Sequence, residues 1–397
     1  MIASLLMSLT FFAAPAPPPP GYAFVTTDFH DAILSAWPQA GGNSGLAAGD
    51  AVCRAQATAA SLPDASNYVA FLSDSNNDAY CRLHNLSGKK SANCGQASLP
   101  AFAGPWTRPD GIPFATLQTL NVDGAIISPA FLTVAGTHTA SMMFSGTQAG
   151  LVADAFTQAQ CNGWTTDAIT GVAAFFDGSM QVFGGSTGCS NELHLLCMHT
   201  GVSQQLNYAQ RSGRQAFVTA STGGHGDLSA WPEAGGKTGI AAGDQICQTE
   251  AAANGLRAPT SFKAWLSDSS GISPVNAMDR LQNDGPWVRT DGLPIAPSKA
   301  GLATFSQLQS LPIMIGQTLV SGSGMVTGTN NDGTAAGADC HGWTSAANGD
   351  SFVEGTGYFV IDWSNSFNEP CDSNFLQLYC FSDLDRLFDS GMESIPY

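Results

Sequence analysis

Ten cysteines are the residues of this sequence whose number and spacing point most clearly to chemistry. No two of them stand in a Cys-x-x-Cys pair, the spacing typical of zinc ribbons and thioredoxin-type redox sites. An even number of cysteines at ordered positions is instead typical of disulfide bonds formed in an oxidising compartment. We therefore expect paired cysteines and an exported protein, located outside the cell or at its surface.

Eight of the cysteines form two sets of four, which appear in the same order in the two halves of the chain. Four cysteines permit three pairings. We favour the nested one, in which an outer bond ties the first helix to the closing strand and an inner bond closes a long loop. Cys81 and Cys94 have no counterpart in the second half and are expected to pair with each other. The other expected bonds are Cys53–Cys197, Cys161–Cys189, Cys247–Cys380 and Cys340–Cys371.

Two further motifs carry charged side chains that could do chemistry. Arg108 and Asp110 recur as Arg289 and Asp291 in the blocks GPWTRPDG and GPWVRTDG. The Asp-Gly step marks a turn, and each arginine is expected to form a structural ion pair with Asp74 or Asp268. No matched base and nucleophile recurs beside them, and neither HExxH nor GxSxG is present. We therefore assign no catalytic residue and no metal ligand.

Asp74–Asp78 has the D-x-N-x-D spacing of a calcium loop. The glycine that should follow is missing, and the twelfth position holds Asn85 in place of glutamate. We interpret the segment as a turn, and Asn330–Gly333 likewise. No cofactor is expected, and calcium is an alternative that no other residue supports.

The elements that must position these residues come from an internal duplication. Ser35–Cys53 and Ser229–Cys247 agree at thirteen of nineteen positions, and the blocks that follow recur in the same order at a spacing close to 190 residues. Among them, LQTL at Leu117–Leu120 matches LQSL at Leu308–Leu311. A repeat of that length is a whole domain. The expected organisation is a signal-like segment with a proline-rich spacer at 1–21, domain 1 at 22–199, a polar linker at 200–214, domain 2 at 215–382 and an acidic tail at 383–397.

Each domain is predicted to be α+β, with few strands, one main helix and much loop. The main helices are expected at Leu46–Ala60, capped by Ser44, and at Ile240–Asn254, capped by Thr238 and stopped by Gly255. Tyr358–Trp363 is predicted to be a core strand. Other strands are expected at 23–26, 68–72, 193–198, 216–219, 262–266 and 375–381. Six tryptophans recur as pairs and are expected in the core, namely Trp37, Trp106, Trp164, Trp231, Trp287 and Trp343.

The charge balance restricts the partners. The chain has 31 Asp and Glu against 14 Lys and Arg, for a formal net charge of −17. Such a surface repels phosphate backbones and sulfated glycans, so we expect neither nucleic acid nor a heparin-like polyanion as a partner. The apolar run Ile2–Ala14 has signal-peptide length and is too short to span a bilayer. No membrane span is expected elsewhere.

The order of these blocks resembles the C-type-lectin-like fold, and the nested cysteine order is similar to that fold and to the endostatin domain of collagens. The resemblance covers about 350 of the 397 residues and implies two tandem domains of this type, similar to secreted bacterial modules of uncharacterised function. The blocks that carry it are best seen at Phe217–Thr219, Ala242–Cys247, Ala264–Ser269, Gly285–Gly292, Gly328–Thr329, Cys340–Ser345 and Leu378–Phe381.

The sequence departs from the family's sugar-binding pattern. Those members hold calcium and sugar with Glu-Pro-Asn or Gln-Pro-Asp and with Trp-Asn-Asp, where this chain has Asn368–Pro370 and Trp363–Asn365. The arginine patch that binds heparin in endostatin is also missing. The resemblance therefore does not imply calcium-dependent sugar binding.

We expect a secreted or cell-surface binding or adhesion protein that is not an enzyme. Its ligand would be an unknown extracellular glycan or protein, since long loops on a braced scaffold suit recognition. Two copies would add avidity if the linker let both engage. The alternatives are a structural component of an envelope or matrix, and an extracellular hydrolase. The hydrolase would need paired carboxylates or a Ser–His pair in a cleft that recurs.

Overall fold

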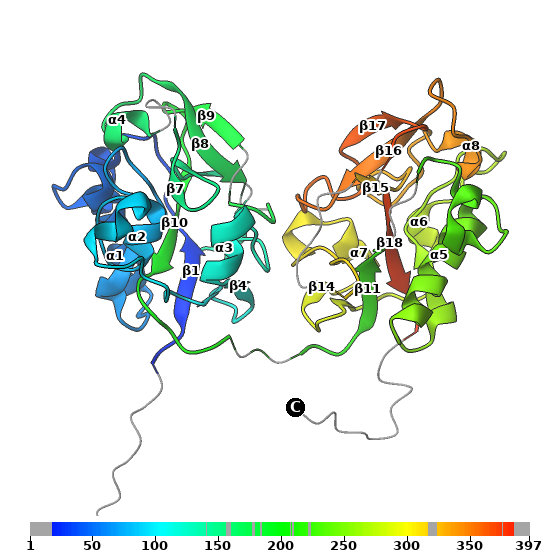
Figure 1. The fold of residues 1–397 in the computed structure, drawn as a ribbon, viewed down its shortest axis with the longest axis horizontal. Helices are drawn as coiled ribbons and strands as arrows, with labels where there is room; N and C mark the ends of the chain where they lie inside the picture. The colour runs from blue at the N-terminus through cyan, green and yellow to red at the C-terminus, as the bar shows by residue number, and fades with distance from the viewer. Residues whose placement is uncertain are drawn as a thin grey trace, which may run out of the picture.

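Two α+β domains follow one another along the chain and lie side by side in a computed structural model (Figure 1). The structure describes residues 18–384 except 140, 156–159, 177–178, 183–184, 207, 209, 221–223, 317–323 and 375. Most of the expected signal-like segment, up to residue 17, and the expected tail from residue 385 lie outside the described residues.

The two domains have the same sheet. In domain 1 the strand order is β4-β3-β1-β10-β5-β8-β9 with β2 beside β10, and in domain 2 it is β14-β13-β11-β18-β15-β16-β17 with β12 beside β18. The first eight-stranded sheet consists of β1 (Gly21–Val25), β2 (Tyr68–Ala70), β3 (Trp106–Thr107), β4 (Pro113–Ala115), β5 (Met142–Phe144), β8 (Thr170–Phe176), β9 (Gly185–Gly188) and β10 (His194–His199). The second consists of β11 (Arg214–Val218), β12 (Phe262–Ala264), β13 (Trp287–Arg289), β14 (Pro294–Ala296), β15 (Gly324–Val326), β16 (Ser351–Thr356), β17 (Phe367–Pro370) and β18 (Gln377–Ser382). A small ribbon of β6 (Thr147–Gln148) and β7 (Val152–Ala153) stands apart.

Helices recur in the same order. Domain 1 has α1 (Gly45–Ala59), α2 (Ala79–Leu83), α3 (Leu117–Asp123) and α4 (Cys161–Trp164); domain 2 has α5 (Gly239–Ala253), α6 (Ala277–Arg280), α7 (Lys299–Leu302) and α8 (Cys340–Trp343). The long helices α1 and α5 lie at the expected positions. Ser44 and Thr238 occupy their N-cap positions, but neither side chain makes a capping hydrogen bond, contrary to the prediction. Gly255 follows α5 with φ +67°, the conformation that ends a helix.

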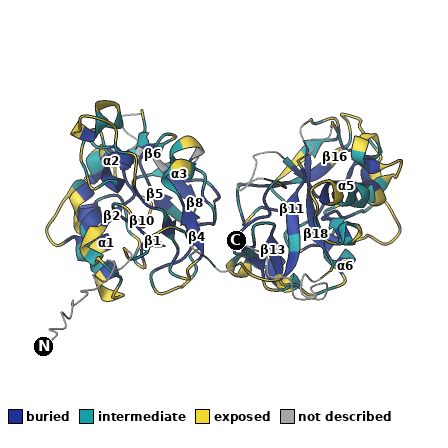
Figure 2. Ribbon diagram, turned by 60° about the horizontal axis from the view of Figure 1, so that its bottom comes forward, coloured by how far each residue is buried: buried dark blue, intermediate teal, exposed yellow. Residues whose placement is uncertain are grey.

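The first and last strands of each domain form its centre. β10 runs antiparallel to β1, with Cys197 opposite Phe24, and β18 runs antiparallel to β11, with Cys380 opposite Phe217. Alternate residues of β1 face different core clusters, because successive side chains of a strand point to opposite faces. Phe24 packs in the cluster beneath α1, whereas Ala23 and Val25 belong to the other. Buried strands therefore run through the middle of each domain (Figure 2).

The disulfides follow the nested pattern that the sequence favoured. The outer bonds, Cys53–Cys197 and Cys247–Cys380, join α1 to β10 and α5 to β18. The remaining bonds are Cys81–Cys94, Cys161–Cys189 and Cys340–Cys371, and no cysteine is free. Every bond stays within one domain. The six recurring tryptophans are buried, as predicted.

The core strand expected at Tyr358–Trp363 was not found. Tyr358–Trp363 is a series of bends, and the strand β16 precedes it. The aromatic and β-branched side chains of this run suit a strand, but tertiary packing overrides that preference: Trp363 folds back onto Gly355 and packs against Trp265 at 5.0 Å between ring centroids.

The match between LQTL and LQSL is a coincidence of letters. Leu117–Leu120 begins helix α3, whereas Leu308–Leu311 lies beyond α7 in an irregular segment. The structural counterpart of α3 is α7, since each follows the β-hairpin and begins after a side-chain cap, Thr116 or Ser298.

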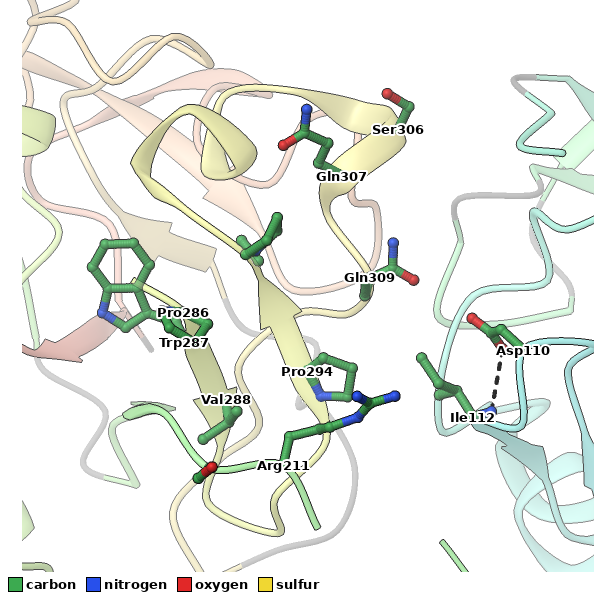
Figure 3. Close-up of a pocket in the computed structure, with 13 residues that line it drawn as sticks. Asp110, Ile112, Arg211, Pro286, Trp287, Val288, Pro294, Ser306, Gln307 and Gln309 are labelled. Carbon is green, nitrogen blue, oxygen red and sulfur yellow. Dashed lines mark hydrogen bonds between the residues drawn. The ribbon is translucent and has the colours of Figure 1, made fainter. Parts of the chain in front are cut away.

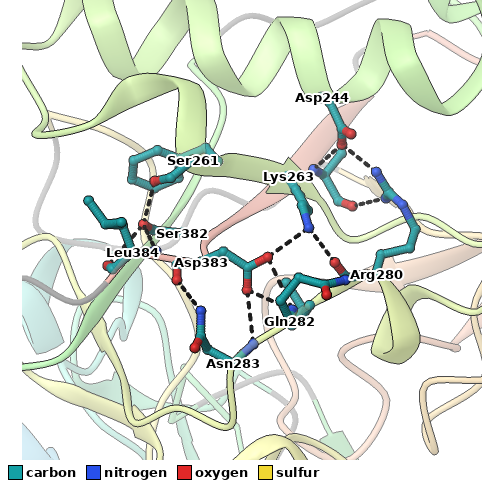
Figure 4. A network of polar contacts seen from close by, with 12 residues as sticks. Asp244, Ser261, Lys263, Arg280, Gln282, Asn283, Ser382, Asp383 and Leu384 are labelled. Carbon is teal, nitrogen blue, oxygen red and sulfur yellow. Dashed lines mark hydrogen bonds and ion pairs between the residues drawn. The ribbon is translucent and has the colours of Figure 1, made fainter.

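A buried ion pair that sequence reasoning missed braces each domain. Arg82 donates to Asp50 Oδ1 at 2.5 Å and to Ala70 O at 3.0 Å. Arg280 and Asp244 repeat the arrangement at 2.5 Å (Figure 4). The signal available in the sequence was the aspartate of the repeated AGD in the helix. In domain 2 the neighbouring Lys263 also binds Asp383, at 2.7 Å, so the first residue of the expected tail is tied to the domain.

Candidate functional site

The repeated Gly-Pro-Trp-x-Arg-x-Asp-Gly block forms the same β-hairpin in both domains. β3 pairs antiparallel with β4, and β13 pairs antiparallel with β14. The turns place Gly111 and Gly292 at φ +81° and +85°, which glycine adopts without a steric penalty. The arginine at the start of each turn is almost completely buried, with Arg108 1% and Arg289 0% exposed.

Each arginine binds the aspartate two residues further on. Arg108 donates through Nε to Asp110 Oδ1 at 3.2 Å and through Nη2 to Oδ2 at 2.5 Å. Arg289 makes the same two bonds to Asp291, at 3.0 and 2.5 Å. Such a bidentate fork is a strong, directional contact. The expectation that these arginines pair with Asp74 or Asp268 was therefore wrong.

Asp74 and Asp268 are occupied by local turns. Asp74 Oδ1 accepts from the amides of Asn76 and Asn77 at 2.8 and 2.7 Å, and Asp268 Oδ1 accepts from the Ser270 amide at 2.8 Å. An aspartate that binds its own backbone in this way needs no distant partner.

Between the two hairpins lies a cleft of about 550 Å³ to which both domains contribute (Figure 3). Domain 1 supplies Asp110 and Ile112, and most of the remaining wall comes from domain 2 and from Arg211 and Ser212 just before it. Arg108 closes the rear of this junction, because its Nη2 donates to Gln309 Oε1 at 2.7 Å.

The cleft has an apolar wall and a polar rim. Its wall is formed by Ile112, Pro286, Val288, Pro294 and Pro297. Arg211, Ser306 and Gln307 are exposed at the rim, and Gln309 is half-buried. An apolar wall with a few polar groups is typical of small-molecule and side-chain binding sites. A guanidinium and two amides suit carbonyl, hydroxyl or carboxylate oxygen atoms.

The equivalent hollow in domain 1 is smaller and covered. It measures about 180 Å³ and lies beside Gly21, Pro105 and Thr107, the counterparts of Arg214, Pro286 and Val288. Linker residues 203–206 form one of its sides. Ser203 is fixed there, since its amide donates to Gly104 O at 3.1 Å and its hydroxyl to Pro105 O at 2.5 Å. At this position the described residues of domain 1 thus form a smaller hollow than the cleft of domain 2.

The calcium-like loop of domain 1 contains a lysine ammonium among its oxygen atoms. Lys89 Nζ donates to Asp74 O at 3.0 Å and to Asp78 Oδ1 at 3.1 Å. Asp78 also accepts from the amides of Lys90 and Ala153 at 2.8 and 2.9 Å.

The predicted turn at Asn330–Gly333 is confirmed by the hydrogen bond from Gly333 N to Asn330 O at 2.8 Å.

A serine, a histidine and an aspartate lie together in domain 2, but their hydrogen bonds differ from those of a catalytic triad. His341 Nε2 contacts Asp350 Oδ1 at 3.0 Å, and Ser345 Oγ donates to Asp350 Oδ2. The hydroxyl thus binds the carboxylate, whereas activation of a nucleophile requires a bond from the hydroxyl to the imidazole. In domain 1 the position of His341 is taken by Asn162, in the matching helix α4.

Two glutamates lie on the neighbouring strands β16 and β17, with Glu354 opposite Phe367 and Glu369 opposite Phe352. Burial, and then the charge of Glu369, raise the pKa of Glu354 from its ordinary value to about 7. Register places Glu354 opposite Val326, and the corresponding residue of domain 1, opposite Phe144, is Ala174. This carboxylate pair therefore does not recur.

The structure brings together two features that the sequence analysis kept apart: the repeated Arg–Asp block and the linker residue Arg211. Nothing in the sequence marked Arg211, since a lone cation in a polar linker has no distinguishing pattern. Across the described residues no group of three His, Cys, Asp or Glu side chains is placed to hold a metal ion. Within the same residues no helix is long and apolar enough to cross a bilayer. No family model matches the sequence, and no curated protein matches it either.

Proposed function

We propose that this protein is an exported, non-catalytic binding protein that takes its ligand in the cleft between the two domains. The observation that carries the proposal is the cleft itself: about 550 Å³, lined from both domains, apolar in its wall and edged by Arg211 and Gln307. Five disulfides without a free cysteine support an oxidising location, outside the cell or at its surface.

We further propose that both domains have the C-type-lectin-like fold. The support is the antiparallel pairing of first and last strands, the outer bond from the long helix to the last strand, and the inner bond nested within it. A fold of this kind does not define a ligand. The ligand has to be inferred from the chemistry of the cleft.

The ligand we propose is an uncharged or acidic segment of an extracellular glycan or protein, bound without calcium. Its apolar part would lie against Ile112 and Val288, and its oxygen atoms would meet Arg211 and Gln307. Because the matching hollow in domain 1 is covered by the linker, one chain offers one such cleft. Avidity would then require several chains on one surface.

Glycan and matrix-protein arrays probed with the full chain test this proposal. We expect binding that survives a calcium chelator and falls at least tenfold in the double variant Arg211→Ala/Gln307→Ala. Lys237→Ala is the matched control, because it removes an exposed positive charge beside α5 and should bind like the wild type.

Three results would contradict the proposal in different ways. Binding that the double variant leaves unchanged would place the ligand elsewhere. Folded protein that binds no array component would favour the alternative of a structural component of the envelope or matrix. Hydrolysis of a glycan or peptide by the wild type would favour the alternative of an extracellular hydrolase.

A further inference from the structure

The contacts between the two domains are related by an approximate twofold axis. Equivalent residues can be assigned from hydrogen bonds, because the two sheets have the same strand order. Ile127 N donates to Phe114 O in β4 at 2.7 Å, and Gln309 N donates to Ile295 O in β14 at 2.7 Å. Ile127 and Gln309 thus occupy the same place in their domains.

The two buried arginines cross the interface to these equivalent positions. Arg108 Nη1 donates to Gln309 O at 3.3 Å, and Arg289 Nη1 donates to Ile127 O at 2.5 Å. The donor atom, the acceptor atom and the direction are the same in both cases. Each domain therefore donates one such arginine hydrogen bond to the other domain and accepts one from it.

A second contact lies where the axis itself would pass. Register pairs Ala174 with Phe144 in domain 1 and Glu354 with Val326 in domain 2, so residues 174 and 354 correspond. Five residues further along each chain segment, Ser179 and Phe359 form an antiparallel β-bridge with each other. Two copies of one position meet in this way only on a twofold axis. Beside the bridge, Met180 N donates to Tyr358 O at 2.6 Å.

From this reciprocity we infer that the face carrying the Arg–Asp block is a self-complementary pairing surface whose fitting partner is another copy of the same domain. We call it the pairing face and define it by Arg108, Ile127 and Ser179 in domain 1 and by Arg289, Gln309 and Phe359 in domain 2. In the intact chain the two pairing faces bind each other.

The chemistry of the pairing face explains why any copy would fit. The acceptors that the two arginines share across the interface are main-chain carbonyl oxygen atoms, and the bridge is also formed by main chain. Arg108 makes one further bond, to the side chain of Gln309, that has no counterpart at Ile127. Each guanidinium is already neutralised by its own aspartate, so crossing the interface does not bring an unpaired charge into a buried site. The linker is the covalent connection between the domains, because no disulfide joins them.

The test is to cleave the linker and to measure whether the two halves stay associated. A protease recognition sequence inserted between Gln205 and Leu206 of the full chain allows cleavage after folding. Native mass spectrometry then gives the masses of the complexes that the products form. We expect the two halves to stay associated, with minor species that pair half 1 with half 1 and half 2 with half 2. Halves that separate at once would overturn the inference, and so would a mixed pair with no like pairs at any concentration.

Lysine variants of the cut protein show whether the arginines hold the face. Arg108→Lys and Arg289→Lys keep a cation but replace the three donor nitrogen atoms of the guanidinium with one ammonium group, which cannot bind the aspartate and the opposite carbonyl in the same geometry. Each is expected to raise the dissociation constant of the halves roughly tenfold, within the range for buried arginines at interfaces. Arg82→Lys is the matched control, because that arginine is also buried and contacts its own domain. An equal effect of all three variants, or no effect of the first two, would contradict the inference.

Discussion

Glu354 is a carboxyl group whose charge state depends on its surroundings. Its side chain packs over Gly324, where an added Cβ would lie 2.5 Å from the carboxyl carbon, and Glu369 lies on the neighbouring strand. Burial and this second carboxylate raise the pKa of Glu354 from 4.5 to about 7. The folded protein therefore holds the proton more tightly than the unfolded chain does. The resulting stabilisation is complete below pH 4.5 and is lost as the pH rises through about 7.

Replacing this carboxyl by an amide should remove the pH dependence. We expect Glu354→Gln to raise the melting temperature relative to wild type at pH 8 and to change it little at pH 5, measured by differential scanning fluorimetry. Glu192→Gln, an exposed position in domain 1, is the control and should show no such trend. A difference between Glu354→Gln and wild type that is the same at both pH values would show that Glu354 titrates normally.

At the scale of elements, the outer disulfide governs how the long helix meets the sheet. Cys53 on α1 and Cys197 on β10 are 144 residues apart, so their bond closes most of domain 1 into one loop. Cys81 and Cys94 close only 13 residues. On the chain-entropy model, a long closed loop restricts the unfolded state more than a short one.

The two bonds should therefore differ in their effect on domain 1. We expect Cys53→Ala/Cys197→Ala to lower the free energy of unfolding by about 4–5 kcal/mol, and Cys81→Ala/Cys94→Ala by about 3 kcal/mol. Urea unfolding of the full chain, followed by circular dichroism, measures both. A larger loss from the short loop would mean that local packing, and not chain entropy, sets the contribution.

Elements were also where the sequence was most informative. The positions of α1 and α5 and the nested bonds followed from patterns local to the chain, such as the repeated AAGD and the cysteine order. The turn at Asp110–Gly111 followed from its own dipeptide. The strand predicted at Tyr358–Trp363 was wrong because the course of this segment depends on contacts with domain 1, which lies far away in sequence. For the same reason, the interdomain partner of Arg108 was beyond any local pattern, since Gln309 lies about 200 residues further along.

The candidate site shows the same limit. Asp110 was singled out as a recurring residue, but the cleft exists only because its hairpin meets domain 2. Arg211 and Gln307 acquire a role from that meeting and not from their neighbours in sequence. The sequence of a duplicated chain allows the fold of each copy to be predicted separately. The contact between the two copies cannot be predicted from either copy alone.

At the scale of the whole molecule, the pairing faces couple the two domains. Buried arginines, a β-bridge and the contact of Phe131 with Phe305 at 6.0 Å join two cores that each have their own disulfides. Domains joined by such an interface lose stability when the partner unfolds, because the contacts that each supplies disappear.

We therefore expect the intact chain to unfold in one calorimetric transition. The double variant Arg108→Lys/Arg289→Lys should unfold in two, as the domains become independent. The control variant Arg82→Lys should lower the temperature of unfolding and keep a single transition. Two well-separated transitions in the wild type would show that the domains are not coupled.

Main-chain acceptors at the junction also have an evolutionary consequence. A carbonyl oxygen is present whatever the side chain, so Ile127 and Gln309 can both supply the main-chain acceptor, although Gln309 also binds Arg108 through its side chain. After the gene duplicated, neutral substitutions at these acceptors carried no requirement for a compensating change in the other copy. Each half could diverge at its own rate, one keeping an open cleft and the other filling its own, without the halves coming apart.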